Sequence, residues 1–206
     1  MVEPLSGLDA EGGVADVPEI TLVGDDAITL ECGVDYTDAG ATALDQCGLD
    51  ITSSIVLDNP VDSHRTGVYT LTYNVSDAAE NAAEEVVRRV TVVDTTAPVL
   101  TLLGENPVVL ECGSAYSDEG ATAVDACDGN ITGAIVVVNP VQSKLPGVYQ
   151  VLYNVTDSSA NNALQLVRTV TVSDTTVPVI TLVGSSSVTI ECGASYKDAG
   201  ATAADV

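Results

Sequence analysis

GVYQVLYNVTDSSANNALQLVRTVTVSD, residues 147–174, carries the pattern that decides the fold. In its first half the large apolar side chains alternate, and Tyr149, Val151, Tyr153 and Val155 share one face. A period of two residues is typical of a β-strand, and the less apolar alternate positions predict a second face exposed to water. DSSANN (157–162) supplies turn residues, so we expect 163–174 to return as the last strand of a hairpin.

Working outward, the residues before this hairpin form further short apolar runs. We expect strands at PVLTLLG (98–104), PVVLEC (107–112) and ITGAIVVV (131–138), with a short strand at NPVQS (139–143). No segment shows an apolar stripe with helical spacing. Six or seven strands in about 80 residues predict an all-β fold, a small immunoglobulin-like sandwich of antiparallel sheets.

The whole pattern recurs along the chain. Cysteine ends the same motif three times, as Cys32 in ITLECG, Cys112 in VVLECG and Cys192 in VTIECG, and the interval is constant (112 − 32 = 80 and 192 − 112 = 80). A period of this length is the size of a small domain rather than of a solenoid repeat. The sequence therefore predicts tandem repeats at 17–95 and 96–175, an incomplete third repeat at 176–206, and a leader or linker at 1–16.

The junctions between repeats are short. DTTAPV (94–99) and DTTVPV (174–179) each contain a proline, which fixes φ and stiffens the entry into the next repeat. We expect stacked domains without flexible tethers. We also expect the third repeat to be cut within a domain; the alternative is a half-domain that completes its sheet with strands from another molecule.

Composition excludes several classes of function. The 206 residues include 30 Asp and Glu but only 6 Lys and Arg, a net charge of −24. So acidic a chain repels nucleic acid and anionic membranes, and suits divalent cations. The sequence has neither a signal-peptide pattern nor an apolar run of membrane-spanning length. With 46% hydrophobic residues but no Trp or Phe, it predicts ordered domains with thin aliphatic cores.

Linked motifs carry a family resemblance over residues 17–206. DTTAPV, YSDEGATAVDACDGNIT (116–132) and GVYQVLYNVTDSSANN (147–162) resemble the bacterial immunoglobulin-like repeats named after a pesticidal crystal protein, and more distantly the hyalin (HYR) repeat. The resemblance implies an extracellular or cell-surface location and a structural or adhesive role. Paired cysteines, which many bacterial copies lack, indicate an oxidising compartment.

The cysteines predict two disulfides. The spacing from Cys32 to Cys47 (47 − 32 = 15) equals the spacing from Cys112 to Cys127 (127 − 112 = 15), so we expect the pairs Cys32–Cys47 and Cys112–Cys127. Each would close a loop worth roughly 3 kcal/mol on loop-entropy grounds. A zinc site is the alternative, disfavoured because the sequence holds a single histidine. Cys192 is expected to be a free thiol, its partner falling at position 207.

Acidic side chains suggest a calcium site. We expect the second strand of each repeat to run back toward the end of the sandwich where the chain enters. The loop after that strand, the loop before the last strand and the incoming junction would then lie together at this end. The predicted ligands are Asp94, Asp118, Asp125, Asp128, Asp157 and Asn161. Oxygen donors without nitrogen or sulfur suit weak extracellular Ca²⁺ binding. The alternative is that these residues only build turns.

No residue pattern indicates catalysis, and we expect no enzyme activity and no required cofactor. His64 lies in a polar loop and has no counterpart in the second repeat, and no nucleophile or phosphate-binding motif is present. The tyrosine pairs Tyr69/Tyr73 and Tyr149/Tyr153 are expected to fill the core, with a sugar-stacking platform as the minor alternative.

The favoured function is a spacer or stalk of an extracellular or cell-surface bacterial protein, adhesin-like and stiffened by Ca²⁺ at its junctions. Its expected partners are the neighbouring repeats and a surface glycan or protein ligand, with neither nucleic acid nor membrane insertion. The alternatives are a carbohydrate- or protein-binding accessory module of a secreted enzyme, and a strand-donating filament subunit.

Overall fold

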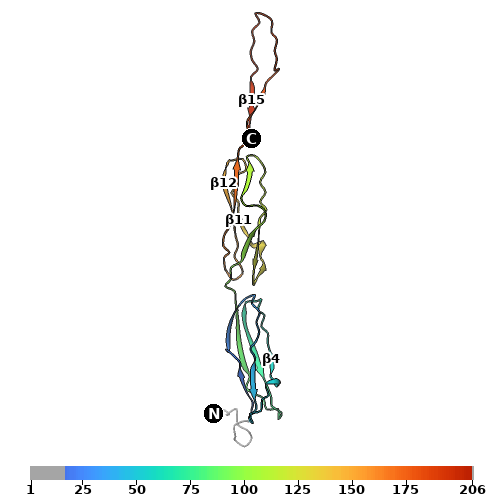
Figure 1. Ribbon diagram of the computed structural model, residues 1–206, viewed down its shortest axis with the longest axis vertical. Coiled ribbons are helices and arrows are strands. Elements are labelled where there is room, and N and C mark those ends of the chain that lie inside the picture. The colour runs from blue at the N-terminus through green and yellow to red at the C-terminus, as the bar shows by residue number, and fades with distance from the viewer. Residues whose placement is uncertain (1–16, 206) are drawn as a thin grey trace, which may run out of the picture. The chain divides into compact units, whose positions relative to one another are not determined.

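The structure is a computed structural model that describes residues 17–205 (Figure 1). The chain divides into two compact units, Met1–Thr96 with Asp125–Gly129, and Ala97–Val124 with Asn130–Val206. Both consist of strands, with one 3-10 turn each, η1 (Thr52–Ser54) and η2 (Thr132–Ala134). The predicted leader at 1–16 lies outside the described residues. Within 17–205, no helix has the length and apolar character needed to cross a membrane.

The first unit packs two sheets face to face. β1 (Glu19–Leu22) pairs with β3 (Ala41–Leu44) in one sheet; the other has the order β2 (Ala27–Glu31), β6 (Val86–Val93), β5 (Gly67–Asn74), β4 (Val56–Asp58). Alternate residues of β5 and β6 point inward, as a period of two requires. Ile20 and Ala43 from one sheet meet Leu71 and Val90 from the other, so the apolar faces form a single core.

The second repeat, whose loop Asp125–Gly129 is counted with the first unit, has the same arrangement of two sheets. Its smaller sheet has the order β10 (Gly129–Asn130), β9 (Ala121–Asp125), β7 (Val99–Leu102). The larger sheet has the order β11 (Val136–Val138), β12 (Gly147–Asn154), β13 (Leu166–Ser173), β8 (Val108–Glu111), and Figure 1 shows β11 beside β12. Val151, Tyr153 and Val170 are buried between the sheets. The predicted hairpin across 157–162 is confirmed, because β12 and β13 pair antiparallel.

A third copy of the β1–β3 strand pair follows. β14 (Val179–Leu182) pairs antiparallel with β15 (Ala201–Ala204). The pairing register is the same in all three copies: Glu19 lies opposite Leu44, Val99 opposite Val124, and Val179 opposite Ala204. The structure therefore confirms an all-β chain of tandem immunoglobulin-like sandwiches.

Three details differ from the sequence prediction. β2 and β8 pair parallel to the last strand of their repeats, because the chain changes sheet after its first strand and continues in the same direction. ATAVD (121–125), not predicted as a strand, forms β9 against β7. Within 131–143, only Val136–Val138 is a strand. Asn139 Oδ1 instead accepts the Val141 N–H at 3.1 Å, a local turn that competes with strand pairing.

Candidate functional site

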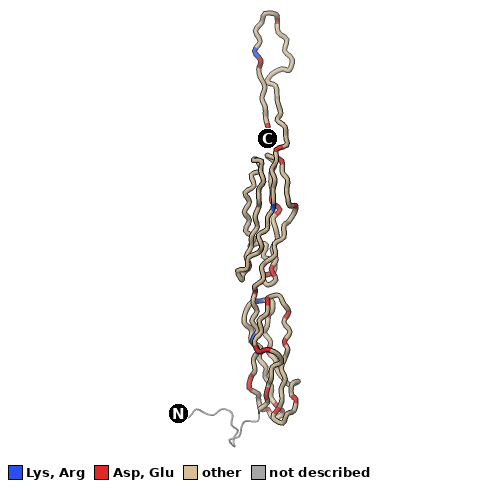
Figure 2. Tube along the Cα trace, turned by 60° about the vertical axis from the view of Figure 1, so that its left-hand side comes forward, with Lys and Arg blue, Asp and Glu red and all other residues tan. Residues whose placement is uncertain are grey.

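A buried arginine lies at the centre of the first sandwich. Basic residues are sparse along the chain (Figure 2), yet Arg88 is 0% exposed. It is in phase with Val90 and Val92 on the inward face of β6. Its guanidinium pairs with Asp38 and also donates from Nη1 to the Tyr73 hydroxyl at 3.1 Å. A charge this deep is tolerated only where its hydrogen bonds are satisfied, so the site must be built around it.

Backbone carbonyls supply the remaining partners of Arg88. Nε donates to Asp25 O at 2.9 Å, and Nη2 donates to Val23 O and, at 3.3 Å, to Gly40 O. The carbonyls of Val23 and Asp25 lie in the turn between β1 and β2, and the carbonyl of Gly40 lies in the turn that precedes β3. The arginine therefore ties those two turns to the last strand of the repeat, which fixes where the chain changes sheet.

Asp38 is the anionic half of this network. Its carboxylate accepts hydrogen bonds from the Tyr73 hydroxyl at 2.7 Å, the Tyr36 hydroxyl at 2.9 Å and the Gly40 N–H at 2.8 Å. Burial alone would raise the pKa of Asp38, but the hydrogen bonds from Tyr73, Tyr36 and Arg88 outweigh it and hold this pKa below its usual value. The pKa of Tyr73 is raised, by burial first and then by the hydrogen bond to Asp38.

A closely similar network recurs one repeat later, although Arg168 Nε, unlike Arg88 Nε, has no hydrogen-bond partner among the described residues. Arg168, 1% exposed, pairs with Asp118, which also accepts the Tyr153 hydroxyl at 2.6 Å and the Tyr116 hydroxyl at 2.9 Å. Asp118 was predicted as a calcium ligand; the structure instead commits its carboxylate to Arg168 and the two tyrosines. We therefore remove Asp118 from the predicted ligand set. Neither arginine was predicted from the sequence to be buried, although each is in phase with the apolar residues of its strand and recurs with the repeat.

A glutamate clamps the junction after each repeat. Glu31, at the end of β2, accepts the Thr95 N–H at 2.7 Å and the Thr96 hydroxyl at 2.7 Å. Glu111, at the end of β8, accepts the Thr175 N–H at 2.8 Å and the Thr176 hydroxyl at 2.9 Å. Hydrogen bonds to a carboxylate favour its charged form. The hydrogen bonds from Thr175, which have the larger effect, and those from Thr176 lower the pKa of Glu111 to about 2.

The structure overturns the predicted disulfides. Cys32 is bonded to Cys127, 95 residues away, with their Cα atoms 5.3 Å apart. Cys47, Cys112 and Cys192 are free thiols. The predicted pairs Cys32–Cys47 and Cys112–Cys127 therefore do not form, whereas the prediction for Cys192 agrees with its free thiol.

Strand direction explains why Cys32 cannot reach Cys47. Cys32 donates its N–H to Val93 O at 2.7 Å, at the end of β6. Cys47 follows Leu44, which lies opposite Glu19, and Glu19 shares a shallow hollow with the residues that begin β6. The length of β6 separates the two sulfurs by roughly 25 Å, several times the Cα–Cα distance of a disulfide.

Asp94 and Asp125 are the predicted calcium ligands that the first unit brings together. Each offers a carboxylate oxygen, and these oxygens lie within 4.8 Å of one another. Asp125 is only 5% exposed. Its Oδ1 accepts the N–H groups of Cys127 at 2.8 Å and Asp128 at 2.9 Å, whereas Oδ2 has no hydrogen-bond partner among the described residues.

Two other predicted ligands form a turn in the second unit. Asp157, 8% exposed, accepts the Ser159 N–H at 2.9 Å and the Asn161 N–H at 2.7 Å through Oδ1. Its Oδ2 accepts Asn161 Nδ2 at 2.9 Å. Asp77 and Asn81 make the same contacts in the first repeat, where Asp77 is less buried. These contacts are the turn-building role that was the alternative to calcium binding.

The tyrosines occupy the core, as expected. Tyr73 and Tyr153 are 1% and 0% exposed, which leaves no ring face for a sugar. Tyr69 and Tyr149 pack against the two cores and donate their hydroxyls to Arg65 O at 2.9 Å and Leu145 O at 2.8 Å.

Comparison with known proteins gives one family match. A family described as "Bacterial surface protein, Ig-like domain" matches residues 20–92 and 100–172. Hyalin of Strongylocentrotus purpuratus is 31% identical over 142 residues, which cover 65% of this chain and 12% of that protein. The match to an immunoglobulin-like family confirms the resemblance on which the sequence analysis relied, but the narrower pesticidal crystal protein type stays a prediction.

Solved structures with a similar arrangement are distant in sequence. A lipoprotein of Bacteroides thetaiotaomicron is 20% identical with a TM-score of 0.35, covering 73% of this chain and 80% of that one. A Clostridium perfringens structure of an M60 catalytic domain with two CBM51 domains is 12% identical with a TM-score of 0.43, covering 84% of this chain and 33% of that one. Fibronectin(III)-like modules of Clostridium thermocellum are 12% identical with a TM-score of 0.30, covering 76% and 95%.

Proposed function

The chain belongs to the immunoglobulin-like domain family of bacterial surface proteins, and from this premise we propose that it is a spacer that holds another part of its parent protein away from the cell. One observation carries the proposal. At the end of β2, Glu31 binds the junction residues Thr95 and Thr96, and the next residue, Cys32, is covalently bonded to Cys127 of the following repeat. A junction held by both contacts has little freedom to bend, which is what a spacer requires. We assign no reaction to this chain.

Small-angle X-ray scattering of the whole chain tests this proposal. We expect the oxidised protein to fit one fixed arrangement of its first two repeats, and the C32S/C127S double variant to require a broad ensemble for the same two repeats. C47S is the matched control, because Cys47 is an exposed free thiol, and we expect it to scatter like the wild type. Oxidised wild-type protein that scatters as freely jointed domains would contradict the spacer function.

We further propose that Ca²⁺ binds at Asp94 and Asp125. Two carboxylates with oxygens within 4.8 Å repel each other by about 3 kcal/mol at an effective dielectric constant near 20 when both are ionised. A divalent cation converts this repulsion into attraction, and Asp125 Oδ2 is a buried acceptor atom that such an ion would satisfy. Asp128, Asp157 and Asn161 stay predicted ligands from the sequence.

Calorimetric titration and thermal unfolding in millimolar Ca²⁺ test this site. For a Kd on the order of 10⁻⁴–10⁻³ M, 10 mM Ca²⁺ should stabilise the folded protein by roughly 1.4–2.7 kcal/mol. D125N should abolish the shift while keeping the turn, because the amide oxygen still accepts both N–H groups. D45N, in the corresponding exposed loop of the first repeat, is the control. D157N tests the wider ligand set, and an unchanged melting temperature of wild-type protein would refute the site.

One observation favours strand donation as a second candidate function. Large apolar side chains around β14 are exposed, with Val177, Val179 and Ile180 at 76%, 63% and 73%. No second sheet covers β14 and β15 within residues 177–205. Light scattering during size-exclusion chromatography over a range of concentrations should separate the two candidates, since a filament subunit associates and a spacer stays monomeric. The accessory-module alternative would be supported by specific binding of the whole chain on a glycan array.

A further inference from the structure

We propose that Cys112 is positioned to form a second disulfide with a cysteine placed one repeat later at the position of Cys127. The proposal does not depend on the spacer function. It rests on two features of the structure: the backbone frame that holds Cys32 is duplicated around Cys112, and the register that places Cys127 is duplicated at β15.

The frame around Cys32 has three parts. The Cys32 N–H donates to Val93 O at 2.7 Å, which anchors the cysteine to the end of β6. Gly33 follows with φ +85° and donates to Ser63 O at 2.9 Å. A Cβ on this glycine would lie 3.0 Å from Ala126 O, so glycine permits the close approach of the loop that carries Cys127.

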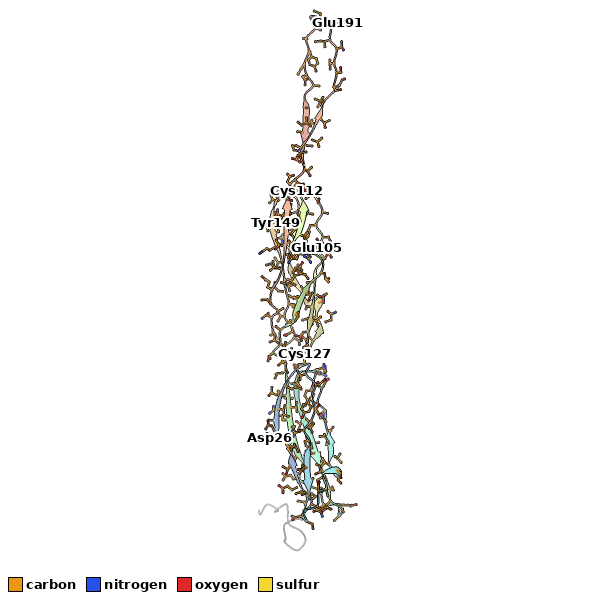
Figure 3. The ribbon with its side chains drawn as sticks, viewed as in Figure 1. Asp26, Glu105, Cys112, Cys127, Tyr149 and Glu191 are labelled. Atoms are coloured by element: carbon orange, nitrogen blue, oxygen red, sulfur yellow. A yellow bond between two sulfur atoms is a disulfide. The ribbon has the colours of Figure 1, made fainter. Side chains whose placement is uncertain are left out.

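Cys112 has the first two parts of this frame. Its N–H donates to Ser173 O at 2.8 Å, and Gly113, with φ +83°, donates to Ser143 O at 2.7 Å. The preceding glutamate clamps the junction threonines in both repeats, Glu31 in the first and Glu111 in the second. The Cys112 side chain is 4% exposed, against 2% for Cys32. Cys112 nevertheless remains a free thiol, although its surroundings are those of a disulfide-bonded cysteine. Figure 3 labels Cys112 and Cys127.

The other half of the bond is set by strand register. Cys127 lies three positions after Val124, which is opposite Val99, and Cys47 lies three positions after Leu44, which is opposite Glu19. In the third copy Ala204 has this place, opposite Val179, so the corresponding residue is at 204 + 3 = 207. Adding the separation of 95 residues seen in the first bond to Cys112 gives the same position, 112 + 95 = 207.

The chemistry is ordinary thiol–disulfide exchange. The thiolate of one cysteine displaces one sulfur of a small disulfide such as oxidised glutathione, and the thiolate of the second cysteine then displaces the remaining glutathione. Two protein thiols become one disulfide, one glutathione disulfide becomes two thiols, and the two electrons pass to glutathione. By the same reasoning, Cys47 is positioned to form such a disulfide with a cysteine placed one repeat earlier at the position of Cys32. Such a pattern staples each repeat to the next rather than closing any repeat on itself.

The test is to extend the chain by a single cysteine after Val206 and to map disulfides by mass spectrometry of an unreduced digest. The added thiol has a choice between Cys192, which is nearby in the same repeat, and Cys112, which is distant in sequence and belongs to the repeat before. In glutathione buffer we expect a disulfide-linked peptide that joins the added cysteine to Cys112. The peptide that carries alkylated Cys112 should then be largely absent from the digest. A bond to Cys192, or a Cys112 that alkylates fully once denatured, would overturn the proposal.

Two controls keep the outcome interpretable. In the extended chain carrying C112S, the added cysteine should be recovered free or bound to glutathione. In the unextended chain, the digest should contain Cys32 joined to Cys127. Cys32 joined to Cys47 would overturn the register argument, whereas failure of the spacer proposal in solution scattering would leave this map unchanged.

Discussion

Replacing Arg88 by methionine should destabilise the first sandwich severely. Methionine keeps much of the length and apolar body of arginine but removes every donor. Asp38, whose side chain is 7% exposed, then keeps its charge without its cationic partner, and the carbonyls of Val23 and Asp25 lose their arginine donors. Removing one partner of a buried ion pair costs about 3–5 kcal/mol. For a domain of this size that corresponds to a fall in melting temperature of at least roughly 12 °C.

The adjacent arginine supplies the control for this variant. Arg89 lies on the same strand but on its exposed face, so R89M should change the free energy of unfolding by less than about 0.5 kcal/mol. Urea unfolding should be followed by amide NMR signals of the first unit, because circular dichroism sums over both units. The R88M/D38N double variant should lose less than the sum of the two single losses, by about 1 kcal/mol or more. A loss below about 1 kcal/mol for R88M alone would refute the central role given to the arginine network.

The other predictions concern the junctions and loops. The pKa of Glu111 is lowered to about 2, so the stability that its clamp contributes should be complete above the ordinary glutamate pKa and should disappear as the pH falls toward 2. NMR titration of the Glu111 carboxyl measures this pKa, and the E111Q variant should lack the pH-dependent contribution. C127S should cost roughly 2–5 kcal/mol in urea unfolding without reductant, whereas C47S should cost almost nothing, and equal losses would contradict the observed pairing. G33A should destabilise more than G48A in thermal unfolding, because both glycines have positive φ but only a Cβ on Gly33 would contact another loop; equal shifts would refute that contact.

Local periodicity determined much of this protein from sequence alone. The alternation from Tyr149 to Val155 predicted β12, and the turn residues of DSSANN predicted the hairpin to β13. The constant interval between the ECG motifs predicted repeated sandwiches, and the match to one family over two segments agrees. The signal for Arg88 was also present, since it is in phase with Val90 and Val92, but it was hidden by the usual assumption that charged residues face water.

Only the tertiary structure decided which loops share an end of the sandwich. The short sequence spacing between Cys32 and Cys47 says nothing about strand direction, and because β2 runs parallel to β6 it carries Cys32 away from the end where Cys47 lies. The same uncertainty made Asp118 resemble a metal ligand, when it belongs to Arg168. Side-chain periodicity is a property of neighbours along the chain, whereas disulfide pairing and ion pairing depend on which sheet each strand joins, and that choice is made by contacts between distant residues.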